Sequence, residues 1–96
     1  MESLRKILSV ISEVKPNLLK KYPIKTLGIF GSYTRGDFTQ DSDIDILVEF
    51  EQPVGIEFID LANELESILQ HKVDLVSRTG IKPKYFKIIE KDLVYV

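Results

Sequence analysis

The sequence predicts an α/β (α+β) domain, a small mixed β-sheet with helices mainly on one face. Three observations lead to this class. Amphipathic segments with three- and four-residue spacing alternate with short apolar runs of strand character, and glycine or proline punctuates most of the boundaries. A chain of 96 residues has room for one domain, which we expect to span residues 1–96.

An amphipathic helix is expected first, because apolar residues recur at helical spacing: Leu4, Ile7, Leu8, Ile11, Val14 and Leu18. Pro16 should end or kink this helix near residue 15, since proline lacks the amide donor and clashes with the preceding turn. Residues 25–30 are predicted to form a short buried strand that stops at Gly31. Residues 32–36 then suit a short helical turn.

Period-two alternation predicts a second strand, with Ile44, Ile46, Val48 and Phe50 on one side. Pro53 and Gly55 end it. A second amphipathic helix follows, marked by Val54, Phe58, Leu61, Leu65, Ile68 and Leu69. Residues 73–76 read as a third strand, and Pro83 suits the first turn of a last helix.

Composition excludes several kinds of protein. The chain carries 13 basic and 15 acidic residues, a net charge of −2, which argues against a dedicated nucleic-acid binder. It has no cysteine, so thiolate metal sites and disulfides are excluded, and a cytoplasmic location is expected. No apolar run reaches the length of a membrane span, so no membrane association is expected.

Asp43 and Asp45 stand one residue apart at the head of the second strand. Residues i and i+2 of a strand point to the same face, and Asp74 would share that face if the third strand lies beside the second. Three such carboxylates repel one another unless a cation lies between them. Oxygen ligands alone select Mg²⁺ or Mn²⁺, and two such ions clamp a phosphoryl group in transfer reactions. A purely structural role in turns is the alternative for Asp43 and Asp45.

Gly31 and Ser32 lie directly after the first predicted strand. Glycine lets a phosphate approach the backbone closely, and Ser32 can cap the following turn. A calcium-binding EF-hand loop is excluded, because its sixth and twelfth positions would be Ile46 and Gln52 in place of glycine and glutamate. A P-loop sequence is absent as well.

Gly31-Ser32, ten residues and Asp43-x-Asp45 together resemble the signature of the DNA polymerase β-like nucleotidyltransferase superfamily. Residues 31–36 (GSYTRG) resemble the form found in its minimal nucleotidyltransferases (MNT), although Thr34 stands where these proteins commonly carry alanine. The resemblance implies the polymerase β-like fold and assigns Asp43, Asp45 and Asp74 as catalytic residues that bind two Mg²⁺ ions, with Mn²⁺ as a possible substitute. Asp74 would also help to deprotonate the acceptor hydroxyl.

The same resemblance implies that Gly31 and Ser32 hold the ATP phosphates, and that Arg35 pairs with a phosphate or with a neighbouring acid. It further implies AMP transfer from ATP to a tyrosine of a HEPN-domain toxin, with this chain as the antitoxin of a type VII toxin–antitoxin pair. Two other functions stay open. The chain could neutralise its partner by contact alone, or it could transfer the nucleotide to a small-molecule or RNA hydroxyl.

Overall fold

The computed structural model describes residues 3–96. Its elements follow one another as α1 (Leu4–Lys21), β1 (Ile24–Phe30), α2 (Ser32–Arg35), β2 (Ile44–Phe50), α3 (Glu57–Leu69), β3 (Val73–Ser77), the 3₁₀ turn η1 (Arg78–Gly80), α4 (Pro83–Glu90) and β4 (Val94–Tyr95). All the helices and strands expected from the sequence are present, with boundaries that differ by a few residues except at the C-terminal end of α1. Within residues 3–96, no helix is both long and apolar enough to cross a membrane.

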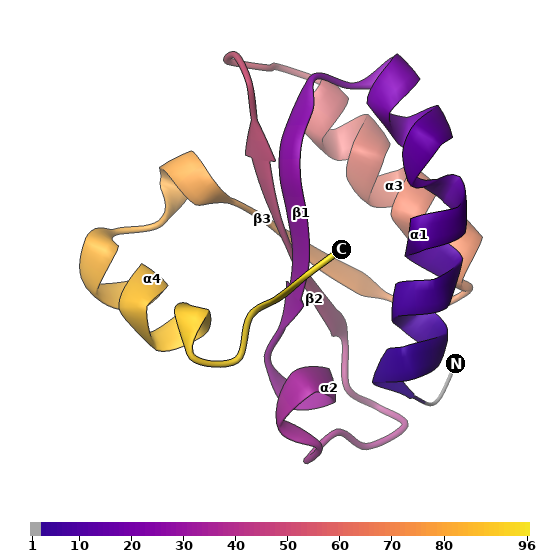
Figure 1. Ribbon diagram of the computed structural model, residues 1–96, viewed down its shortest axis with the longest axis vertical. Coiled ribbons are helices and arrows are strands. Elements are labelled where there is room, and N and C mark those ends of the chain that lie inside the picture. The colour runs from indigo at the N-terminus through magenta and orange to yellow at the C-terminus, as the bar shows by residue number, and fades with distance from the viewer. Residues whose placement is uncertain (1–2) are drawn as a thin grey trace.

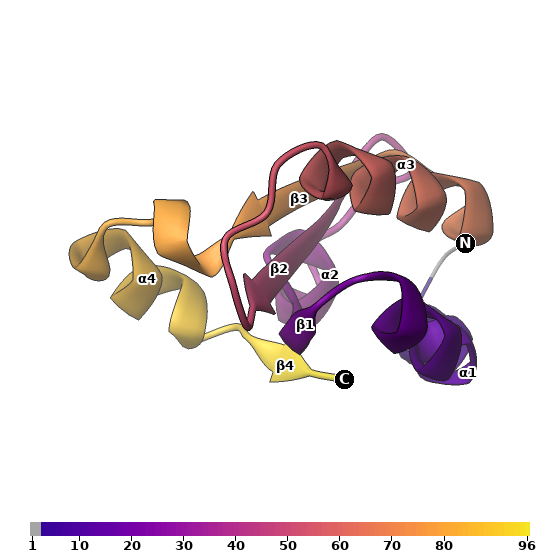
Figure 2. The same ribbon diagram turned by 90° about the horizontal axis from the view of Figure 1, so that it is seen from above.

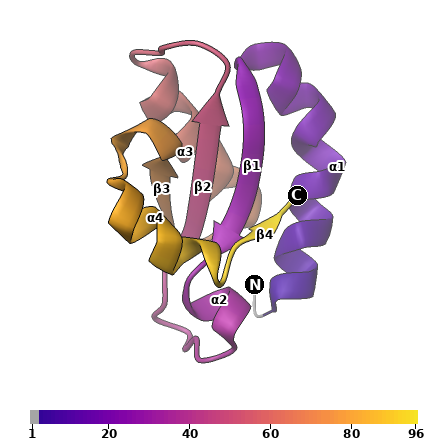
Figure 3. The same cartoon turned by 60° about the vertical axis from the view of Figure 1, so that its left-hand side comes forward.

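The four strands form one mixed sheet in the order β3-β2-β1-β4 (Figure 3). β1 runs antiparallel to both β2 and β4, whereas β2 and β3 are parallel. A parallel pair needs a long crossover, and α3 supplies it between β2 and β3. The expected mixed sheet is therefore confirmed, and its parallel pair lies where the two acidic strands meet.

Helices α1 and α3 cover one face of the sheet, and α4 lies on the opposite side (Figures 1 and 2). The core fills the space between the sheet and the two long helices. Its fully buried side chains come from both helices and from the two central strands: Ile7, Ile11, Leu18, Leu27, Ile29, Ile44, Ile46, Val48, Leu61, Leu65 and Leu69. The helices were expected mainly on one face of the sheet, and α1 and α3, the two helices that build the core, share one face.

The sequence-based expectation for Pro16 is wrong, because α1 continues through this residue to Lys21. Pro16 is exposed, and so is Ser12, whose carbonyl would accept the amide of residue 16 in a regular helix. The proline therefore lies on the solvent side of the helix, where a backbone carbonyl without its helical donor costs less than it would in the core. One half-turn later Leu18 is fully buried, so packing of the last turns outweighs the local cost of the proline.

A two-residue strand, β4, was not expected, because so short a segment carries no periodicity. It pairs with Gly28 and Ile29 of β1. A Cβ atom on Gly28 would lie 2.8 Å from Leu93 Cδ1 and 3.2 Å from the carbonyl oxygen of Val94. The missing side chain of Gly28 therefore allows the C-terminal segment to pair with β1.

Replacing Pro16 with alanine should raise the free energy of unfolding by about 1–2 kcal/mol. Alanine restores the amide donor to Ser12 and removes a penalty of about 3 kcal/mol for proline inside a helix, less about 1 kcal/mol for a more flexible unfolded chain. Urea denaturation at pH 7 measures the difference. Asn17→Ala, at the next exposed position, is the control and should change stability by less than about 1 kcal/mol. A Pro16→Ala protein no more stable than the natural chain would contradict this account of α1.

Candidate active site

The end of β1 and the beginnings of β2 and β3 meet at one edge of the sheet. In the register of the strands, Asp45 lies opposite Phe30 of β1 on one side and opposite Asp74 of β3 on the other. Ile44 and Ile46, which flank Asp45, are fully buried under α1 and α3. Alternation along the strand therefore turns Asp45 to the α4 side of the sheet.

The same alternation sets the direction of the other two acids. Asp43 lies two residues before Asp45, and Asp74 stands between the buried Val73 and Leu75. All three carboxylates consequently lie on the α4 side of the sheet, and Asp45 is the most central of them. The strand order that the sequence reading required for this arrangement is the observed one.

Asp45 experiences the negative charge of both other acids. The pKa of its carboxyl is raised from 3.8 to about 6, chiefly by burial and then by the charges of Asp74 and Asp43, while the charge of Arg35 lowers it. The charge of Arg35 offsets only part of the negative charge that Asp74 and Asp43 place around Asp45. A bound cation would relieve it.

The donor set fits a hard divalent cation, since every candidate ligand is a carboxylate oxygen. In the described part of the chain, however, no group of three or more acidic or histidine side chains is arranged closely enough to hold a metal ion between them. The chemistry and the electrostatics of Asp43, Asp45 and Asp74 therefore suit Mg²⁺ or Mn²⁺, and the strand register already aligns two of the three, Asp45 and Asp74.

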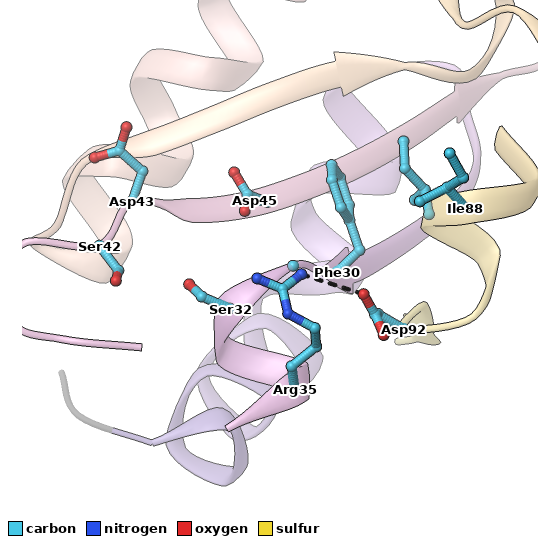
Figure 4. A pocket seen from close by; sticks show the side chains of 10 residues that line it. Phe30, Ser32, Arg35, Ser42, Asp43, Asp45, Ile88 and Asp92 are labelled. Atoms are coloured by element: carbon cyan, nitrogen blue, oxygen red, sulfur yellow. Dashed lines mark hydrogen bonds and ion pairs between the residues drawn. The ribbon is translucent and has the colours of Figure 1, made fainter. Parts of the chain in front are cut away.

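Gly31 contacts Asp45 directly. Its φ angle of 83° lies in a region that residues with a side chain rarely adopt, and a Cβ atom there would collide with the Asp45 carboxylate. Backbone conformation and close approach thus both require glycine. Ser32, the next residue, does not cap α2 as expected. Gly31 is the N-cap residue of α2, and no side chain makes a capping hydrogen bond there. The Ser32 side chain instead faces Asp45 across a pocket (Figure 4).

Thr34, the departure from the family pattern, has a local structural role. Its hydroxyl donates to the carbonyl oxygen of Gly31 at 2.9 Å, and the amides of Thr34 and Arg35 donate to the same oxygen at 3.1 and 3.0 Å. Three donors therefore fix the carbonyl of the glycine that touches Asp45. An alanine would supply only two, so threonine is compatible with the site and strengthens the turn.

Arg35 pairs with acids outside the carboxylate cluster. Its Nε and Nη2 atoms lie 3.2 and 3.3 Å from the two carboxylate oxygens of Asp37, and Nη1 lies 3.2 Å from Asp92 (Figure 4). The sequence analysis expects Arg35 to pair with a phosphate or with a neighbouring acid. The contacts that the structure describes are with acids. The Asp92 pair also links α2 to the end of α4.

The pocket between these elements has a volume of about 430 Å³ and combines residues from β1, α2, β2 and α4. It is lined by Phe30, Gly31, Ser32, Arg35, Ser42, Asp43, Asp45, Ile88, Ile89 and Asp92. The α4 residues were not found from the sequence as site residues, because their spacing reads only as an amphipathic helix. Their place beside Asp45 follows from how α4 packs.

His71 is a second feature that the sequence analysis did not identify. Its side chain is half-buried, and Nε2 donates to the carbonyl oxygen of Ser42 at 2.6 Å. The buried Tyr33 stacks on Phe38 with ring centroids 4.3 Å apart and meets the edge of His71 at 6.1 Å. These contacts hold the loop that leads into Asp43, and no sequence motif signals them.

Comparison with known proteins agrees with this geometry. Residues 11–96 match the model of the nucleotidyltransferase domain family. The protein adenylyltransferase MntA of Thermococcus cleftensis is 39% identical over 97 residues, covering 100% of this chain and 98% of that protein.

Solved structures extend the likeness to the fold. A structure provisionally described as a minimal nucleotidyltransferase superposes with a TM-score of 0.74 at 28% identity, covering 94% of this chain and 88% of that one. A chain in a toxin–antitoxin crystal structure with AMP-PNP gives a TM-score of 0.69 at 26% identity, covering 95% and 69%. The family model and the near full-length relative agree with the position of the aspartates at one end of the sheet. The chain belongs to the nucleotidyltransferase family as an enzyme of the minimal nucleotidyltransferase type.

Proposed function

We propose that this nucleotidyltransferase transfers AMP from ATP to a tyrosine hydroxyl of a HEPN-domain toxin, depends on Mg²⁺, and acts as the antitoxin of that pair. The observation that carries the proposal is the packing of Gly31 against Asp45, with Asp74 opposite Asp45 in the sheet. A relative with 39% identity bears the name protein adenylyltransferase, and a structural neighbour was solved in a toxin–antitoxin complex with AMP-PNP. We place the reaction in the cytoplasm, where ATP is supplied.

Each residue of the site has a role in this proposal. Two Mg²⁺ ions, when bound, would stabilise negative charge on the triphosphate and the attacking oxygen. Asp43 and Asp45 hold them, Asp74 completes the ligand set, and the backbone at Gly31 with the Ser32 hydroxyl receives the β- and γ-phosphates. Arg35 stands at the pocket edge, where the Asp92 and Asp37 pairs orient it toward phosphate.

The reaction is an in-line displacement at the α-phosphorus. The tyrosine oxygen forms a bond to that phosphorus, the bond to pyrophosphate breaks, and Asp74 accepts the hydroxyl proton. Most of the rate enhancement would come from positioning and from charge stabilisation, which a rigid strand pair can provide.

The decisive experiment is intact-mass spectrometry of a candidate HEPN protein incubated with this chain, Mg²⁺ and each nucleoside triphosphate in turn. The proposal expects an adduct of one AMP mass per modified tyrosine, formed with ATP and absent with the Asp43→Asn/Asp45→Asn variant. Tight binding of the HEPN protein without any adduct would favour neutralisation by contact. An adduct that forms equally with the double variant would overturn the role of the aspartates.

Asp45→Asn should stabilise the metal-free protein while abolishing transfer. Because the folded-state pKa of Asp45 is raised, the folded chain binds more protons than the unfolded chain between pH 3.8 and about 6. Asp45 therefore lowers stability as pH rises through that window, and the cost persists at pH 7. Since the side chain is partly exposed, we expect a gain of about 1 kcal/mol for the variant rather than the full value of the shift.

Urea denaturation in EDTA at pH 4 and pH 7 measures this effect, with Asp41→Asn as the control at an exposed acid outside the cluster. Adding Mg²⁺ should raise the melting temperature of the natural chain and leave that of Asp45→Asn unchanged. If Asp45→Asn is destabilised in EDTA at pH 7, the account of charge repulsion at this site is wrong.

Ser32→Ala should weaken ATP binding about tenfold, the loss expected for one hydrogen bond to a charged group, without lowering the melting temperature of the free protein. The Ser32 side chain has no cap role that its loss would disturb. Isothermal calorimetry with AMP-PNP and Mg²⁺ measures the affinity. Ser9→Ala, on the exposed side of α1, is the matched control. An unchanged affinity for AMP-PNP would remove Ser32 from the phosphate site.

A further inference from the structure

Helix α4 presents apolar side chains to solvent beside the catalytic pocket. Ile88 is 60% exposed and Tyr85 is 53% exposed, and they lie three residues apart on the same side of the helix. Ile88 also lines the pocket together with Asp43 and Asp45. α4 therefore forms one wall of the pocket that holds Asp43 and Asp45, and Ile88 belongs both to this wall and to the exposed side of the helix (Figure 4).

Lysines surround these two side chains. Lys82, Lys84, Lys87 and Lys91 are all exposed. In the part of the chain that the structure describes, none of the four has a carboxylate oxygen within 4.0 Å, whereas Lys21 and Lys25 are paired with glutamates on other elements. Residues 82–92 contain only two acids, and Asp92 is paired with Arg35. This segment is therefore locally basic in a chain whose net charge is −2.

Two contacts fix the helix relative to the pocket. The guanidinium of Arg78 lies 3.7 Å from the centre of the Phe86 ring, which attaches the middle of α4 to η1 after β3. Just beyond the C-terminal end of α4, Asp92 accepts from Arg35 of α2 at 3.2 Å. A ligand held on the exposed side of α4 would thus have a defined position relative to Asp45.

We propose that this α4 surface, formed by Lys84, Tyr85, Lys87, Ile88 and Lys91, docks an acidic and apolar segment of the acceptor protein next to its modified hydroxyl. The inference rests on the proposed function and specifies the chemical character of the partner segment that docks there. An apolar centre with a charged rim is the anatomy of a protein–protein contact, and the unpaired lysines complement acidic residues on the partner. ATP fills the pocket, so the acceptor approaches along its α4 wall.

Labelled peptides test the surface directly. The full chain is titrated against a fluorescein-labelled acidic peptide, EELYLEE, a basic one, KKLYLKK, and a uridine oligonucleotide, and anisotropy is recorded. The acidic peptide should bind at least tenfold more tightly than the other two. Equal binding of both peptides, no binding of either, or tighter binding of the oligonucleotide would overturn the proposal, the last by showing that the lysines serve RNA.

Matched substitutions locate the binding. Ile88→Asp should weaken binding of the acidic peptide at least tenfold and Lys87→Glu at least threefold. Ile59→Asp changes a 57% exposed isoleucine on α3, across the sheet, and Lys20→Glu changes an exposed lysine on α1. Both controls should stay within twofold of the natural chain. Because Ile88 is exposed, its variant should keep the natural melting temperature, and unaltered peptide binding by it would refute the docking surface.

A parallel assay separates failure of this proposal from failure of the proposed function. With ATP and Mg²⁺ added, AMP transfer to the tyrosine of the acidic peptide is followed by mass spectrometry. If peptide binding depends on Ile88 but no acceptor, the HEPN protein included, receives AMP, the docking surface is supported and the proposed enzymatic function is rejected. Transfer that is insensitive to Ile88→Asp and Lys87→Glu would keep the enzyme and reject the docking surface.

Discussion

The arrangement of the site depends on the parallel pairing of β2 with β3, which sets Asp45 opposite Asp74. A shift of one residue along either strand would turn one of these carboxylates into the core, where Ile44, Ile46 and Leu75 now pack. The apolar face therefore fixes the register, and the register fixes the acids. Because α3 makes the crossover between the two strands and also buries Leu61, Leu65 and Leu69, the same helix that stabilises the fold holds the carboxylates together.

Stability and chemistry are divided between the two faces of the sheet. The core lies under α1 and α3, whereas the α4 side carries like charges in close proximity and a glycine in a positive-φ conformation. Both features cost free energy in the absence of ligand. The packed face offsets that cost, and a bound cation would remove part of it by neutralising the like charges.

Sequence reasoning succeeded where a periodic pattern or a fixed spacing carried the information. Alternation around Asp43 and Asp45 predicted their common face, and the apolar character of residues 73–76 predicted the strand that brings Asp74 beside them. It failed at Pro16, because the burial of Leu18 outweighs a local penalty, and at Ser32, because Gly31 occupies the cap position.

The remaining features arise from tertiary packing that no local pattern encodes. His71 bonds to a carbonyl 29 residues away in the chain, and Arg35 pairs with Asp92 across 57 residues. Strand β4 consists of two residues whose pairing depends on the absence of a side chain at Gly28. Such contacts become visible only when the separate segments are placed together.

The site needs little structure to assemble. The polar side chains that line the pocket come from strand ends and short turns, where backbone geometry positions them with little additional structure. The α4 wall of the pocket differs, because α4 contributes Ile88 and Ile89 to the lining and exposes Tyr85 and Ile88 to solvent. Under the proposed function, this wall would leave recognition of the acceptor to the partner protein. The domain would then supply the transfer chemistry, and the partner would supply the specificity.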